Sequence, residues 1–105
     1  MSTYVLATVT RWVSDKPIPG LVEVVLVDGA SHAWTFVDKT VMFGPKDNIL
    51  LATSSYPAEV HLACTVVRRT AEAVTVSTAL PYGLETTDGK STFVVLPSQI
   101  VKSPG

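Results

Sequence analysis

Three side chains of this sequence are soft metal ligands or nucleophiles: His32, His61 and Cys64. His61 and Cys64 lie three residues apart in a segment of alternating apolar and polar residues, which is typical of a β-strand. Residues three apart on a strand point to opposite faces, so this pair cannot share a metal ion or act as a nucleophile and base. Cys64 lies between Leu62 and Val66 on the apolar face, where burial makes a thiol inert. The sequence therefore predicts neither a metal site nor a cysteine nucleophile.

The other catalytic patterns also fail on spacing. Gly89-Lys90-Ser91 looks like the end of a phosphate-binding loop, but Leu84 stands where that loop needs its first glycine, and a strand pattern follows instead of a helix. No serine lies in a Gly-x-Ser-x-Gly elbow, and the acidic residues are scattered. We expect a protein that is not an enzyme and uses no cofactor. An enzyme that uses His61 is the third-ranked alternative.

The charge of the chain narrows the class of protein further. Its 105 residues include eight Lys and Arg and nine Asp and Glu, which gives a formal net charge of −1. Charged residues make up 16% of the chain, against roughly 25% in a typical soluble domain. This composition excludes a disordered chain, which is poor in apolar residues and rich in charge. It also disfavours a nucleic-acid binder that relies on a basic surface.

Length, cysteine content and targeting signals suggest a single cytoplasmic domain covering residues 1–105. No apolar run approaches the roughly 18 residues that a membrane-spanning helix needs. The first residues alternate between apolar and polar and carry no basic residue before the apolar part, so they indicate a strand rather than a signal peptide. A lone cysteine, Cys64, excludes an intrachain disulfide and fits the reducing cytoplasm.

β-Branched residues dominate the chain and predict strands rather than helices, because they pack well on a pleated surface. Alternation and turn residues predict strands at Thr3–Val13, Leu21–Val27, Ser31–Lys39, Ala58–Arg69, Val74–Thr78 and Ser91–Leu96. A bulge is expected near Arg11, which takes a position on the apolar face of the first strand. Asp28-Gly29 and Asp88-Gly89 predict hairpin turns. Asp47 or Asn48 can cap one helical turn over Ile49–Leu51.

This order of elements predicts an all-β fold: a small antiparallel barrel of about six strands with one short helical turn. Three strands, then a loop or helical turn, then two or three further strands resemble an OB-fold, and an SH3-like barrel is the neighbouring alternative. The resemblance is one of architecture and implies no function.

Two of the predicted strands are apolar on both faces, and a barrel of this size has only one interior. Their outward apolar residues are Leu21, Val25, Val27, Val94 and Leu96. These residues must be covered by the helical turn, the C-terminal tail or another chain, since monomers rarely expose large apolar patches. The leading prediction is a non-enzymatic protein that acts through protein–protein association, as a homodimer with one shared patch. Its size suits an accessory or immunity-type bacterial protein.

The alternative function is an OB-like domain that binds single-stranded nucleic acid or a small ligand. Such domains stack bases on exposed aromatic rings in a basic groove. The candidate residues for one such face are Trp12, Arg11, Tyr56, Arg68, Arg69 and Tyr82. Arg68-Arg69 is the only adjacent basic pair, so the charge balance disfavours nucleic acid as the partner.

Overall fold

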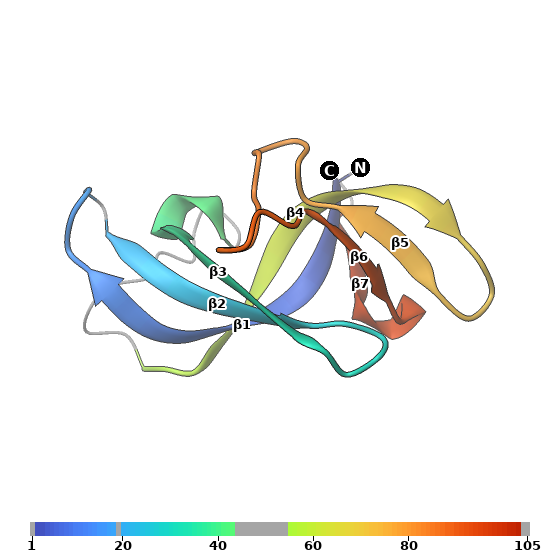
Figure 1. The fold of residues 1–105 in the computed structure, drawn as a ribbon, viewed down its shortest axis with the longest axis horizontal. Coiled ribbons are helices and arrows are strands. Elements are labelled where there is room, and N and C mark those ends of the chain that lie inside the picture. Colours follow the sequence, from blue (N-terminus) through green and yellow to red (C-terminus); the bar gives the residue numbers. More distant parts are fainter. Residues whose placement is uncertain (1, 19, 44–54, 104–105) are drawn as a thin grey trace.

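The computed structural model describes residues 2–18, 20–43 and 55–103. Across these ranges, seven strands form one antiparallel sheet that curls into a half-barrel (Figure 1). The strands are β1 (Ser2–Ser14), β2 (Leu21–Val27), β3 (Ala33–Lys39), β4 (Ala58–Arg69), β5 (Val74–Ser77), β6 (Thr92–Val95) and β7 (Ile100–Ser103). The prediction of an all-β antiparallel fold is confirmed. No helix in the described ranges is long and apolar enough to cross a membrane.

β1 is the strand around which the sheet is organised. The strand order is β3-β2-β1-β4-β5-β6, and β7 adds to β1 beside β2. The first half of β1 pairs with β4 and β7, and its second half pairs with β2. The register with β2 shifts between Val9 and Arg11 and again between Trp12 and Ser14. These shifts confirm the bulge predicted near Arg11, and a bulge bends a strand and increases its twist.

The core lies inside the curl and follows the predicted alternation along most strands. β2 buries Val22, Val24 and Leu26 and turns the residues between them outward. The largest fully buried rings, Phe36 of β3 and Phe93 of β6, lie 5.7 Å apart between centroids. The two edge strands of the sheet, β3 and β6, therefore contribute to one hydrophobic core, and this shared core holds the sheet in its curled shape.

The second half of β4 departs from the prediction. Val66, expected on the apolar face with Cys64, is 39% exposed, whereas Ala63, which strict alternation places on the opposite face, is 6% exposed. The reason is a change of neighbour: β4 pairs with β1 as far as Cys64 and with β5 from Thr65 onward. Beyond Cys64 the strand extends past the core, so its alternation no longer separates an inside from an outside.

The β2–β3 hairpin exists, but it is not the tight Asp-Gly turn that the sequence predicted. The positive φ of 63° belongs to Ser31, and the loop extends from Asp28 to His32. The Asp28 carboxylate shapes this loop by accepting hydrogen bonds from the backbone N–H groups of Ala30 and His32. Asp side chains commonly fold turns in this way.

The second predicted turn is confirmed, and the chain after it holds an unexpected strand. Gly89 has φ +84°, and its N–H donates to the Thr86 carbonyl at 2.9 Å. The last predicted strand ends at Val95 and is followed by a 3₁₀ turn over Pro97–Gln99 and then β7. A further 3₁₀ turn follows β3 at Thr40–Met42. The helical turn predicted over Ile49–Leu51 lies outside the described residues.

Candidate binding surfaces

The two ends of the sheet meet where the β2–β3 loop lies against β6. The Gly29 N–H donates to the Val94 carbonyl at 2.9 Å, and the Thr87 N–H donates to the Thr35 carbonyl at 3.0 Å. A Cβ atom at Gly29 would lie 3.3 Å from the Val94 oxygen, so the approach leaves little space for a side chain. These contacts form a seam that closes one side of the half-barrel.

Gln99 links the end of β2 to the residue that follows β6. Its side-chain nitrogen donates to the Val27 carbonyl at 2.7 Å, and its side-chain oxygen accepts from the Leu96 N–H at 2.8 Å. Around this seam Val27, Val94 and Leu96 are 47%, 52% and 46% exposed. We call these three aliphatic residues the seam patch.

The structure brings together three of the five predicted interface residues. Leu21 and Val25 also lie on the outer side of β2, but both are half-buried. Leu21 pairs with Lys39 at the far end of β2, away from the seam patch. The predicted apolar row is therefore real as an outward face of β2, and its exposed part is concentrated at the seam.

An aromatic cluster lies beside the seam patch. The Trp34 indole N–H donates to Asp28 Oδ2 at 2.9 Å, and the His32 ring lies 4.3 Å from the Trp34 ring. Lys90 Nζ lies 4.7 Å from the Trp34 ring centroid and 5.7 Å from that of Phe93. The Trp34 hydrogen bond is the main cause that lowers the pKa of Asp28, and the His32 backbone N–H adds to it. This cluster holds the β2–β3 loop in place over the seam.

The six residues predicted for a ligand-binding face do not share one face. Arg11 and Trp12 lie near the end of β1, whereas Arg68 and Arg69 lie at the end of β4, which runs in the opposite direction. The two strand ends point to opposite sides of the molecule (Figure 1). The structure therefore separates the basic pair from the aromatic residue that was expected to act with it.

Arg11 and Trp12 are also engaged within the fold. Arg11 forms an ion pair with Glu23 at 3.2 Å, and the Trp12 indole N–H donates to Asp15 at 2.9 Å. Hydrogen bonds from Thr10 and then Arg11 lower the pKa of Glu23. Trp12 packs partly against the core. These contacts give both residues structural roles that their spacing in the sequence did not reveal.

Of the remaining two candidates, one is structural and one lies at a cavity. Tyr56 is half-buried against the core. Tyr82 is 57% exposed and borders a cavity of about 390 Å³ beside β4. The lining residues of this cavity, which we call the β4 pocket, are Thr3, Tyr4, Ala63, Cys64, Thr65, Val66, Pro81 and Tyr82. Sequence reasoning missed the pocket because its walls come from three separate segments.

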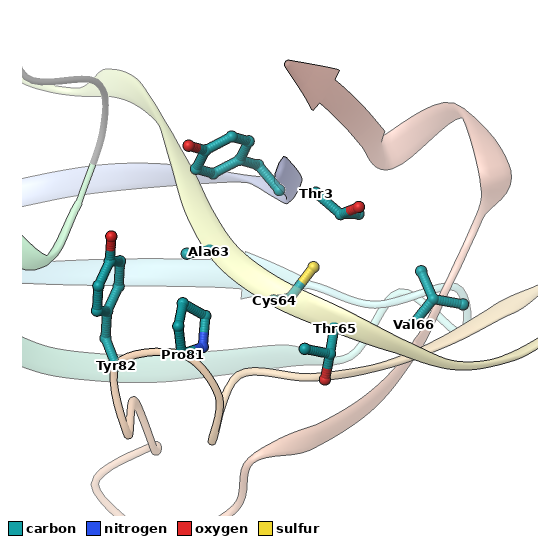
Figure 2. Close-up of a pocket in the computed structure, with 8 residues that line it drawn as sticks. Thr3, Ala63, Cys64, Thr65, Val66, Pro81 and Tyr82 are labelled. Atoms are coloured by element: carbon teal, nitrogen blue, oxygen red, sulfur yellow. The ribbon is translucent and has the colours of Figure 1, made fainter. Parts of the chain in front are cut away.

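Figure 2 shows the β4 residues of the pocket crossing the view, with Thr3 on one side and the loop carrying Pro81 and Tyr82 on the other. Cys64 is 5% exposed, and burial raises the pKa of its thiol to about 11. The thiol is therefore protonated near neutral pH and acts as a small apolar group. His61, on the same strand, lies 3.6 Å from Glu59 and 6.1 Å from the Tyr4 ring.

The remaining chemistry of the described ranges is sparse. No three His, Cys, Asp or Glu residues there come together as a metal site. No family model matches the chain, and neither a curated protein nor a solved structure matches it. The fold defines a small all-β protein with a curled antiparallel sheet, and two surfaces distinguish it: the seam patch and the β4 pocket.

Proposed function

We propose that this chain is a non-enzymatic β-protein that acts through protein–protein association, and that two copies associate through the seam patch. The observation that carries the proposal is the seam patch itself, in which three aliphatic side chains are about half exposed around one closure point. Interface cores are apolar and depleted in charge, as this patch is.

A second copy is the partner that the surface chemistry supports best. A two-fold dimer uses the same patch on both subunits, so the uncharged aliphatic surface of one subunit packs against the identical surface of the other. Two side chains of opposite charge contact the neighbouring Trp34: Lys90 lies over its ring, and Asp28 accepts a hydrogen bond from its indole nitrogen. A rim with both signs of charge can pair with itself across a two-fold axis, whereas a rim with one sign would repel itself.

Sedimentation velocity at micromolar concentrations tests this proposal. The wild-type chain is expected at twice its 11.2 kDa mass. Val94→Glu is expected to give the monomer, because it places a charge in the apolar contact of each subunit. Val94 is 52% exposed, so its substitution leaves the core intact.

The matched control is Val41→Glu. Val41 is 69% exposed on the 3₁₀ turn after β3, at the end of that strand opposite the seam. This variant is expected to remain a dimer. A wild-type chain that sediments as a monomer, or a Val94→Glu chain that stays dimeric, would contradict the proposal.

A cytoplasmic location is part of the proposal. Its support is the cysteine content of the chain, since a lone buried cysteine and no disulfide framework fit a reducing compartment. An accessory or immunity-type role fits a small chain whose work is done by one association surface.

A further inference from the structure

We infer that the β4 pocket binds a neutral, planar aromatic molecule. This inference does not depend on the proposed dimer, since the seam patch shares no residue with the pocket. It rests on the chemistry of the lining, on the cavity volume and on the way the Tyr82 loop is anchored.

The lining combines aromatic, aliphatic and hydroxyl groups and contains no charged side chain. Tyr4 and Tyr82 supply two aromatic rings, and Ala63, Val66 and Pro81 supply apolar surface. A ligand carboxylate or phosphate would lose water here without meeting a cation among the lining side chains, which costs free energy. A neutral ring can bury its faces against the aromatic and apolar walls instead.

The volume sets the size of the ligand. Ligand pockets commonly measure roughly 300–1,000 Å³, and the β4 pocket, at about 390 Å³, lies near the lower limit. A small ring system fits this space better than a nucleotide or a peptide. Four of the lining side chains carry a hydroxyl group with which a polar atom of the ligand can form a hydrogen bond: Thr3, Tyr4, Thr65 and Tyr82.

The exposed Tyr82 is held in place by its loop, which is anchored at both ends. The Thr78 hydroxyl donates to the Leu84 carbonyl at 2.7 Å, and the Leu84 N–H donates to the Thr78 carbonyl at 2.9 Å. Leu84 and Thr78 are fully buried, and the Gly83 N–H donates to the Ala79 carbonyl at 2.8 Å. Because this loop is already ordered, it loses little conformational entropy when a ligand binds against Tyr82.

A pair of fluorescent probes that differ in one charged group tests the inference. N-phenyl-1-naphthylamine is neutral, and 8-anilinonaphthalene-1-sulfonate adds a sulfonate to the same rings. Titration of the full chain is expected to show one site for the neutral probe, with binding at least about tenfold tighter than for the sulfonate, since none of the lining residues carries a positive charge. Equal or tighter binding of the sulfonate would overturn the inference.

Two substitutions locate the site. Tyr82→Ala removes one aromatic wall and is expected to weaken the neutral probe about five- to tenfold. Thr65→Phe is expected to abolish binding, because Thr65 points toward the loop side of β4 (Figure 2) and a larger ring there fills the pocket. Both residues are exposed, so the variants keep the core.

The matched controls are exposed neighbours that do not line the pocket. Leu80→Ala shares the loop of Tyr82, and Val67→Phe shares the strand of Thr65. Both are expected to bind the neutral probe like the wild type, as is Val94→Glu at the seam patch. Loss of binding in Val94→Glu with retention in Tyr82→Ala and Thr65→Phe would place the probe elsewhere and overturn the inference.

Discussion

Gly20 precedes β2 in a conformation that other residues adopt only with strain, and its replacement by alanine tests how the loop is packed. Its φ is +130°, and a Cβ atom there would overlap Cζ2 and Cη2 of Trp12. The Gly20 carbonyl also accepts a hydrogen bond from the Thr40 N–H at 3.0 Å, so the backbone cannot relax freely. Gly20→Ala therefore adds both backbone strain and a steric conflict.

The two contributions have separate magnitudes. Holding a non-glycine residue in this region costs about 1–3 kcal/mol, and overpacking against a fixed ring costs about 1–3 kcal/mol. Their sum, about 2–6 kcal/mol, is a large part of the roughly 5–15 kcal/mol by which a domain is stable. Gly89→Ala is the matched control, because Gly89 has φ +84° and no atom within 4 Å of its added Cβ. It is expected to cost only about 1–2 kcal/mol.

Urea unfolding followed by circular dichroism measures both variants without relying on Trp12 fluorescence. A double-mutant cycle then isolates the steric part, because Trp12→Phe removes the two overlapping atoms and keeps an aromatic ring. Gly20→Ala is expected to cost less in the Trp12→Phe background than in the wild type, by about 1–3 kcal/mol. Equal costs in both backgrounds would refute the steric argument. Equal costs at Gly20 and Gly89 would likewise show that the contact with Trp12 adds nothing to the backbone strain.

Two further predictions follow from the ionisable groups. The pKa of Asp28 is lowered in the folded state, so its charged form contributes stability at neutral pH that is lost as the pH falls below its ordinary value of 3.8. Asp28→Asn is therefore expected to be less stable than wild type at pH 7 by urea unfolding, with the difference shrinking near pH 3; a constant difference would contradict this. Iodoacetamide at pH 8 is expected to label Cys64 much more slowly in the native chain than in urea, because burial raises the pKa of the thiol to about 11. Equal labelling rates, measured by mass spectrometry, would show that the thiol is accessible.

Local patterns predicted the bounds of two strands well. The bounds of β2 and β4 agree with the prediction because turn residues or a proline flank each strand and alternating or continuous apolar residues fill it. From the sequence, the residues of β7 are predicted only as part of the C-terminal tail. The segment Ile100–Ser103 is only four residues long, which is too short for alternation to predict a strand. Its pairing with β1 depends on residues at the other end of the chain.

The candidate surfaces were predictable in residue type but not in grouping. Outward apolar residues on two strands could be identified from alternation. However, Val27 and Leu96 come together through the contact between Gly29 and Val94, which is a long-range tertiary contact that local patterns do not predict. The six residues chosen for a ligand face had suitable side chains, but strand direction places Arg11 and Arg69 at opposite ends. The local signal at the β4 pocket is Pro81-Tyr82-Gly83, since proline and glycine indicate a break after a strand. Such a break does not indicate that the loop lines a pocket.

The pairing of β7 with β1 has a consequence for how this sheet assembles. Ser2 pairs with Ser103, and both ends of the described chain lie together (Figure 1). During synthesis, the edge of β1 at Ser2–Val5 stays open until Ile100–Ser103 is made, and an open strand edge is a template for aggregation. A circularly permuted chain in which β7 leads directly into β1 would turn this most distant pairing into a local hairpin, and folds rich in local contacts form faster.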